Sequence, residues 1–389
     1  MMTIRYVRAS WVAAAVLACT LMSGVAGAAT TTERPGSILI FPKVVTTGSR
    51  DTVIQITNTS NMSDILRCFY LNGDTCAPND FEIALTKQQP TEWDVRSGRR
   101  VNPSDSQTGL DPGLIPPLAE NFQGALICAE VDISDAPVKH NAVKGEATLV
   151  DRSNSVTRNA VSKYNAVAVQ GLGTTHTSGN MLNLNDSDYS ACPASLIVNL
   201  NREGSDPVIE QLGNGGRCVA GTNNGAACNN NADCNSNNCS TGQSRVETRV
   251  TVVPCSLDFE FLTLSNFKLS FLFEDEEETG ISRGNGPFPC WGSFTMSQSL
   301  VGLNATPYMT GRFKSVVATG PAVPVVGVAE TFYGDSVANT ASAAANLHSL
   351  GICSNSTQFI TCMRDIDCPT GTSPCVYTTA STIQLSSTP

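Results

Sequence analysis

Residues Gly36–Leu71 read GSILIFPKVVTTGSRDTVIQITNTSNMSDILRCFYL and contain three short apolar segments separated by polar turns. The segments Ser37–Phe41, Thr52–Thr57 and Ile65–Leu71 are rich in Ile, Val, Leu and Phe, which pack well on a pleated sheet. The first segment is almost continuously apolar, as in a strand buried on both faces, whereas the second alternates apolar and polar residues. This pattern predicts the opening strands of an antiparallel β-sandwich.

Similar strand-like segments recur along the rest of the chain. Before residue 201 they include Phe81–Leu85, Gly124–Val131, Gly145–Val150, Tyr164–Val169 and Leu196–Leu200. A second set with clear period-two alternation comprises Val246–Val252, Leu257–Phe261 and Phe267–Phe273. The predicted fold class is therefore all-β, an immunoglobulin-like antiparallel β-sandwich built as two sandwich domains or one extended one. Only Ser336–Leu350, preceded by a potential N-cap at Asp335, has a helical pattern.

The first thirty residues have the features of a signal peptide. Arg5 and Arg8 form a basic start, Trp11–Leu21 is apolar, and Ala26–Ala28 matches a small-x-small cleavage site. We expect cleavage after Ala28 and a secreted or extracytoplasmic chain. A less favoured alternative is lipid anchoring at Cys19, because the residues before it resemble a bacterial lipoprotein box.

The charge and hydropathy of the chain exclude several classes of function. Removing the signal peptide, which has two arginines and no acid, takes the formal net charge from −10 to about −12. An acidic chain repels phosphate backbones and anionic headgroups, so we expect no nucleic-acid partner. No later segment is long and apolar enough to span a bilayer, because Ser315–Ala329 is interrupted by glycine and prolines.

Fourteen cysteines remain after the signal peptide, and an even number in an exported chain predicts seven disulfides. A zinc site within the cysteine clusters is not expected, because they contain no C-x2-C pair and no histidine. From proximity in the sequence, Cys68 is expected to pair with Cys76, and Cys255 with Cys290. The predicted disulfide cysteines are Cys68, Cys76, Cys128, Cys192, Cys218, Cys228, Cys234, Cys239, Cys255, Cys290, Cys353, Cys362, Cys368 and Cys375.

Two stretches form an internal repeat with the plans C-x9-C-x5-C-x4-C (Cys218–Cys239) and C-x8-C-x5-C-x6-C (Cys353–Cys375). Neither could bury a core, so each is expected to be a loop insertion held by two disulfides of its own. Extended segments flank them, including Val208–Leu212, which suggests insertion at hairpin tips. The expected organisation is a signal peptide (1–28), an N-terminal β-sandwich domain (29–212), a Cys-rich insertion (213–242), a second β-rich domain (243–352), a second Cys-rich insertion (353–378) and a C-terminal tail or edge strand (379–389).

One run of five acidic residues is the strongest candidate for a metal site. Adjacent carboxylates repel one another, and calcium, which prefers oxygen ligands, would relieve that repulsion. A solvated loop is the competing interpretation. Calcium is the only cofactor that the sequence suggests, with the candidate ligands Glu274, Asp275, Glu276, Glu277 and Glu278.

Catalytic signatures are absent from the sequence. The chain contains no G-x-S-x-G elbow, H-E-x-x-H motif or glycine-rich phosphate loop. A dispersed hydrolase site would have to use His140, His176 or His348, which we expect to be structural or solvated. For glycan binding, the mature chain offers only Trp93 and Trp291 as tryptophan platforms.

The segments SILIFPKV (Ser37–Val44), DTVIQITNTS (Asp51–Ser60) and LTKQQPTEW (Leu85–Trp93) resemble a group of uncharacterised exported bacterial proteins. The cysteine stretches, especially Cys362–Cys375, resemble small Cys-rich repeats of such proteins. The resemblance implies a bacterial, extracytoplasmic setting and no functional residue.

The sequence therefore favours an exported, non-enzymatic β-sandwich protein of the cell envelope or surface with a structural, adhesive or interaction role. Its partner would be a protein or an extracellular polymer, bound by an edge strand or by displayed loops. The alternatives are an exported hydrolase with a dispersed site and a calcium- or glycan-binding module.

Overall fold

The computed structural model describes residues 30–100, 113–151, 160–201, 216–218, 222, 227–228, 231–236, 239–241, 245–274, 280–295, 308–316, 323–334, 340–354, 359–369, 371 and 374–387. These residues form β-strands and two short 3-10 helices, and no α-helix occurs among them. The predicted all-β, disulfide-bearing fold is confirmed. The signal peptide, Cys19 and Val208–Leu212 lie outside the described residues.

The helix predicted over Ser336–Leu350 is wrong. Thr340–Asn346 forms strand β23, and His348–Cys353 forms β24. β23 pairs with β22 (Val325–Gly334) in antiparallel register along its whole length. The backbone pairing with β22 outweighs the helix preference of the alanines in β23, which amounts to less than ~1 kcal/mol per residue.

The first sandwich consists of two antiparallel sheets. One has the order β4-β3-β6-β1-β9 and the other the order β5-β2-β7-β8. Their bounds are β1 (Ile38–Val45), β2 (Arg50–Asn58), β3 (Asp64–Asn72), β4 (Pro78–Leu85), β5 (Pro90–Asp94), β6 (Gln123–Val131), β7 (Val143–Asp151), β8 (Ala160–Asn165) and β9 (Val167–Val169). The core between them includes Phe41, Ile54, Tyr70 and Trp93, and the Trp93 indole N–H donates to the Tyr70 hydroxyl at 2.6 Å.

The five-stranded sheet is buried on both faces, as the continuous apolar run in its strand β1 predicts. Every residue of β1 is buried. The outer face of the sheet packs against a small sheet of order β10-β28-β17, and the rings of Phe69 and Phe259 stack there at 4.3 Å. The small sheet comprises β10 (Met181–Leu184), β28 (Ser381–Gln384) and β17 (Leu257–Asp258).

The sequence predicted a tail or an edge strand at the C-terminus. In the structure, Ser381–Gln384 form β28, which is an inner strand of its sheet. β28 lies between β10, to which it is antiparallel, and β17, to which it is parallel. Its Ile383 is completely buried, and the guanidinium of Arg67 donates to the carbonyl of Ser386 at 2.9 Å. The last strand therefore covers the core of the first sandwich.

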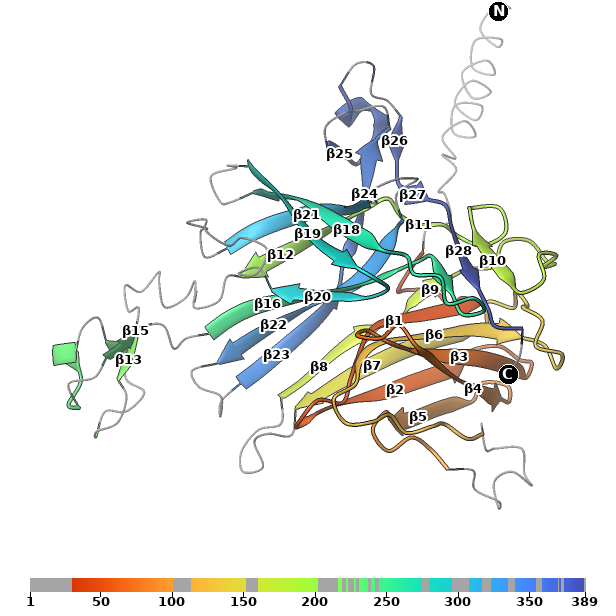
Figure 1. Ribbon diagram of the computed structural model, residues 1–389, viewed down its shortest axis with the longest axis horizontal. Coiled ribbons are helices and arrows are strands. Elements are labelled where there is room, and N and C mark those ends of the chain that lie inside the picture. Colours follow the sequence, from red (N-terminus) through yellow and green to blue (C-terminus); the bar gives the residue numbers. More distant parts are fainter. Residues whose placement is uncertain are drawn as a thin grey trace, which may run out of the picture.

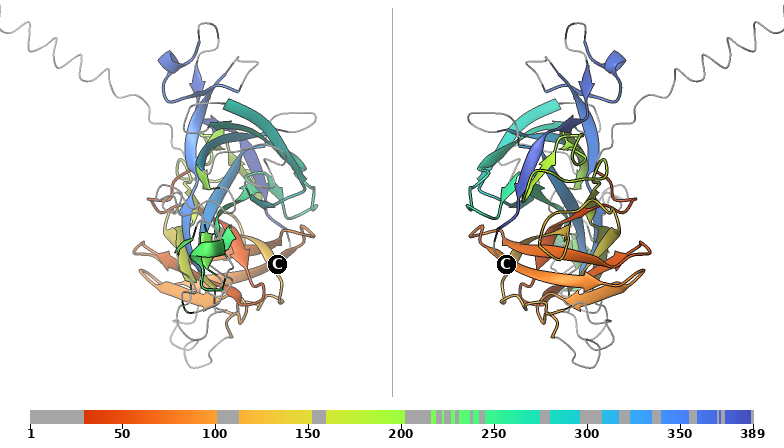
Figure 2. Two further views of the ribbon diagram at one scale, coloured as in Figure 1. Left: turned by 90° about the vertical axis from the view of Figure 1, so that its left-hand side faces the viewer. Right: turned by 90° about the vertical axis from the view of Figure 1, so that its right-hand side faces the viewer.

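The second sandwich also has two antiparallel sheets, which in Figures 1 and 2 lie above those of the first. The larger has the order β19-β18-β21-β12-β24-β25, with β26 also paired to β24, and the smaller the order β20-β16-β22-β23. Their remaining bounds are β12 (Ser195–Asn201), β16 (Arg245–Pro254), β18 (Phe267–Glu274), β19 (Gly280–Phe288), β20 (Gly292–Thr295), β21 (Tyr308–Val316), β25 (Thr361–Cys362) and β26 (Cys375–Val376). The buried side chains of Phe267, Phe271 and Phe273 alternate with exposed or half-buried neighbours in β18, as predicted.

Strand β12 pairs with β21 and β24 of the second sandwich. From the sequence, this segment is predicted to belong to an N-terminal domain ending at residue 212. The local sequence does not show whether this strand belongs to the first or the second sandwich, because an apolar strand can pack in either core. Its pairing partners decide to which sandwich it belongs.

Two of the predicted disulfide pairings are wrong. Cys68 bonds to Cys128, which lies opposite it on β6, and not to Cys76. Cys76 bonds to Cys290, and Cys255 bonds to Cys192. Sheet register brings distant cysteines together, so proximity in the sequence misleads here. The Cys76–Cys290 bond joins the two sandwiches.

The internal cysteine repeat is also a structural repeat. In the second copy, Cys353 bonds to Cys368 and Cys362 to Cys375, around a 3-10 helix at Asp365–Asp367. Gly351 and Cys353 face Cys362 and Cys375 in the backbone register. In the first copy, Gly216 and Cys218 face Cys228 and Cys239 in the same way, and Cys234 is disulfide-bonded. That copy comprises β13 (Gly216–Cys218), β14 (Ala227–Cys228), a 3-10 helix (Asn231–Asp233) and β15 (Cys239–Thr241).

The predicted position at a hairpin tip is wrong for the second copy and stays a prediction for the first, because Val208–Leu212 lies outside the described residues. The described strands before and after the first copy, β12 and β16, belong to different sheets of the second sandwich. The second copy lies between β24 and the pair β27 (Thr378–Thr379) and β28, which join other sheets; β27 pairs with β11 (Cys192–Pro193). Both copies therefore lie in connections that cross between sheets.

Candidate functional site

The outer face of the sheet β5-β2-β7-β8 carries a row of polar side chains. Gln55 on β2 lies opposite Glu92 on β5 and Glu146 on β7, and Glu146 lies opposite Asn165 on β8. Because side chains alternate between the two faces of a strand, the neighbours of Gln55 point into the core. The four polar residues therefore form one line across all four strands.

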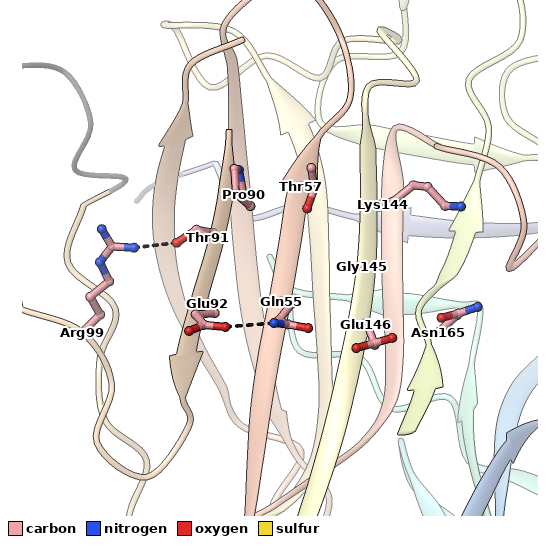
Figure 3. A pocket seen from close by; sticks show the side chains of 10 residues that line it. All are labelled: Gln55, Thr57, Pro90, Thr91, Glu92, Arg99, Lys144, Gly145, Glu146 and Asn165. Carbon is pink, nitrogen blue, oxygen red and sulfur yellow. Dashed lines mark hydrogen bonds between the residues drawn. The ribbon is translucent and has the colours of Figure 1, made fainter. Parts of the chain in front are cut away.

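A second line and a rim complete a groove of about 730 Å³ (Figure 3). Thr57 lies opposite Pro90 and Lys144, two residues along the same strands. At the β5 side, the Arg99 guanidinium donates to the Thr91 hydroxyl at 2.5 Å. On the floor, the Gln55 amide donates to Glu92 Oε2 at 2.8 Å.

The opposite rim of the groove depends on the second sandwich. The backbone N–H of Asn165 donates to the side chain of Asn346 on β23 at 3.1 Å, and the Asn346 amide donates back to the Asn165 carbonyl at 2.7 Å. Strands β8 and β23 run side by side here (Figure 1). This contact therefore anchors the β8 edge of the groove to the second sandwich.

The lining of the groove suits a ligand with many hydroxyl groups. It presents amide, carboxylate, hydroxyl, ammonium and guanidinium groups, and its described residues include no aromatic ring, histidine or cysteine. Glu92 and Glu146 flank Gln55 on strands two apart, so their backbones are separated by about 9.5 Å, twice the usual strand spacing. Such a face can donate and accept many hydrogen bonds at once.

The predicted calcium ligands are only partly described. Glu274 lies at the end of β18, and its carboxylate pairs with the Arg312 guanidinium at 2.6 Å. Asp275, Glu276, Glu277 and Glu278 lie outside the described residues. The calcium site stays a prediction.

The three histidines contact different groups. His140 Nδ1 lies 2.9 Å from Asp64 Oδ1, while His176 Nδ1 lies 3.5 Å from Asp188 Oδ1. His348 is exposed on β24. Within the described residues, no serine, threonine or cysteine side chain hydrogen-bonds to a histidine ring, so the histidines form no nucleophile–base pair.

Two further side-chain groups do not provide a binding site. Trp93 and Trp291 are both buried, and the Trp291 indole donates to the Pro42 carbonyl at 2.8 Å, so neither is a platform for a sugar ring. The sulfurs of Cys353, Cys362 and Cys368 lie within 4.8 Å of one another, but all three belong to disulfides. A thiolate metal site is therefore excluded for these three residues.

The sequence alone does not indicate the groove residues. In it, Gln55 and Thr57 are only polar residues that alternate with isoleucines in a predicted strand, and Glu146 lies only within another predicted strand. The alternation of polar and apolar residues indicates that these side chains face solvent. The row can be recognised only when the strand order β5-β2-β7-β8 and its register are known.

Comparison with known proteins gives little guidance. No family model matches the chain, and no curated protein matches it. Among solved structures, the chain is similar to one entitled "Crystal Structure of Thermotoga maritima 1070", with 10% sequence identity and a TM-score of 0.24, covering 34% of this chain and 95% of that one. A similarity at that score supports no inference about this chain. Among the described residues, no helix is long and apolar enough to cross a membrane.

Proposed function

We propose that this chain is an exported, non-enzymatic β-sandwich protein that binds a hydroxyl-rich extracellular polymer, such as a glycan, in the groove on β5-β2-β7-β8. The observation that carries the proposal is the row Glu92–Gln55–Glu146–Asn165, a line of hydrogen-bonding side chains across four strands. A polymer lying along this row would meet a new strand every ~4.8 Å, close to the spacing of successive sugar units.

The disulfides support an oxidising, extracytoplasmic compartment for the chain. Five described cysteine pairs are bonded, and one of them joins the two sandwiches. Free extracellular polymers and cell-surface glycans are found in that setting. Release after Ala28 and adhesion at the cell surface are parts of this proposal, with lipid anchoring at Cys19 as the alternative.

A hydrolase is the second candidate, and the same groove favours it. Glu92 and Glu146 lie on either side of Gln55 on the same face of the sheet, with backbones about 9.5 Å apart, and inverting glycosidases use two carboxyl groups roughly 6.5–9.5 Å apart. In that case one carboxyl would protonate the leaving oxygen and the other would activate a water molecule.

An array of neutral and acidic oligosaccharides, probed with the mature chain, tests the binding proposal. We expect Gln55→Ala to weaken binding about tenfold, since a net hydrogen bond contributes roughly 0.5–1.5 kcal/mol. Glu120→Gln, in an exposed turn that does not line the groove, is the control. Binding to no oligosaccharide, or equal binding by Gln55→Ala and wild type, would overturn the proposal.

Release of reducing ends from the bound oligosaccharides separates the two candidates. The binding proposal predicts none. If the protein is a hydrolase, reducing ends appear, and Glu92→Gln or Glu146→Gln lowers the rate about 10²- to 10⁴-fold while the sugar still binds.

A further inference from the structure

Asp64, Glu130 and His140 converge at one end of the first sandwich, away from the polar groove. Asp64 begins β3, and Glu130 lies on the adjacent strand β6 opposite Leu66, so the two carboxyls point to the same face of the sheet. His140 follows in the loop after β6, with Nδ1 at 2.9 Å from Asp64 Oδ1. One donor atom from each residue lies within 4.8 Å of the others.

The two carboxyl groups are buried without a lysine or arginine partner. Both residues have only 1–3% of their surface exposed. Within the described part of the chain, His140 is the only basic side chain that pairs with Asp64, and no ion pair involves Glu130. Burial of a charge requires compensation, which this cluster does not receive from the protein's own cations.

Asp64 Oδ2 is a buried acceptor with no hydrogen-bond donor. The Asp64 carboxyl faces that of Glu130, and two ionised carboxylates can only accept hydrogen bonds. Burial, followed by the nearby charge of Asp64, raises the pKa of Glu130 to about 8, so near neutral pH the pair shares a proton through a hydrogen bond between the two carboxyls. A metal ion between the two groups would replace that proton and bind both carboxylates.

The backbone holds Glu130 in place and still leaves it able to bind an ion. Its Oε2 accepts the N–H groups of His140 (2.8 Å) and Asn141 (3.0 Å), and its Oε1 accepts that of Ala142 (2.7 Å). A carboxylate offers about four acceptor positions, and the Ser37 hydroxyl lies within reach of the fourth. That hydroxyl can instead donate to Asn141 Oδ1 at 3.1 Å, which would free the position for an ion. Asn141 adopts a left-handed conformation (φ 52°), which turns the three N–H groups toward the same carboxylate.

We propose that Asp64, Glu130 and His140 bind one zinc ion. An imidazole nitrogen and two carboxylate oxygens match the donors that zinc takes, whereas calcium prefers oxygen ligands alone. The His140 side chain is 38% exposed, so an ion can enter from solvent, and a water molecule can complete a four-coordinate site. The ion would fasten the loop after β6 to the start of β3.

Calorimetric titration of Zn²⁺ into the mature chain, freed of metal with a chelator, tests this proposal. We expect one equivalent to bind. His140→Ala should weaken the affinity for Zn²⁺ at least about 100-fold. Removing a residue that only orients a metal ligand costs up to about 100-fold, and removing a ligand should cost at least as much. His176→Ala and His348→Ala are the matched controls and should bind like wild type.

Asp64→Asn, which keeps the size of the side chain and removes its charge, should weaken binding similarly. Circular dichroism checks the fold of each variant, and His140→Ala is decisive if Asp64→Asn does not fold, because His140 is partly exposed. A visible absorption spectrum of the Co²⁺-substituted wild type should show a four-coordinate ion. The proposal is overturned if wild type binds no Zn²⁺, if it binds Ca²⁺ in preference, or if His140→Ala binds Zn²⁺ like wild type.

Discussion

A buried ion cluster holds the two sandwiches together at the level of single residues. Glu330 on β22 of the second sandwich is completely buried, and its carboxylate binds Lys43 of β1 at 2.5 Å and the guanidinium of Arg50 on β2. Burial, opposed by the charge of Glu330, lowers the pKa of Lys43 to about 8. Removing one member of such a cluster leaves the others buried and unpaired.

Glu330→Gln should lower the free energy of unfolding by about 3–5 kcal/mol, the usual cost of breaking a buried ion pair from one side. Burial raises the pKa of Glu330, but the charges of Lys43 and Arg50 and the hydrogen bonds from them outweigh it and leave the pKa below its usual value of 4.5. The carboxylate thus stabilises the fold above pH 4.5, and this stabilisation is lost as the pH falls through the folded-state pKa. The difference between wild type and variant should therefore shrink below pH 4.5.

Urea unfolding at pH 7 and at steps between pH 5 and pH 3 measures this difference. Glu274→Gln is the matched control, because Glu274 pairs with Arg312 at a partly exposed site. Its loss should cost no more than about 1 kcal/mol. A Glu330→Gln variant as stable as the Glu274→Gln variant, or one with the pH profile of wild type, would contradict the account.

These residue-scale features could not be predicted from the sequence. Lys43 and Glu330 are 287 residues apart, and nothing near either one indicates a partner. The number of cysteines predicts disulfides, but Cys76 and Cys290 are separated by 214 residues and meet only because the two sandwiches pack together. Local sequence carries no information about such contacts.

At the level of elements, the sequence predicted strand character better than strand partners. The alternation in Phe267–Phe273 and the continuous apolar run at Ser37–Phe41 correctly indicated one-sided and two-sided burial. The alanine-rich segment Thr340–Asn346 was misassigned because its strand form depends on β22. The last strand, β28, was underestimated for the same reason, since its two neighbours come from β10 and β17.

Ile383→Ala, in β28, should lower the free energy of unfolding by about 2–5 kcal/mol, because Ile383 is fully buried between the small sheet and the five-stranded sheet. Ile366→Ala is the control with the same chemistry at an 82% exposed position, and its effect should stay within about 0.5 kcal/mol. Thermal and urea unfolding measure both. Equal effects would show that β28 does not cover the core.

At the level of the whole molecule, the two sandwiches form one interlocked body. β12 contributes an early segment to the second sandwich, and β28 returns the C-terminus to the first. The groove is lined by residues of the first sandwich, and its edge at Asn165 is held by Asn346 of the second. The sequence could predict an all-β, disulfide-bearing fold, but not a groove whose edge strand is fastened to the other sandwich.

The central claim is that the polar face of β5-β2-β7-β8 binds a hydroxyl-rich polymer. A crystal structure of the mature chain with the oligosaccharide that binds most tightly on the array tests it most directly. We predict that sugar hydroxyls hydrogen-bond to Gln55, Glu92 and Glu146. A sugar bound at any other surface, with the groove filled only by solvent, would contradict the account.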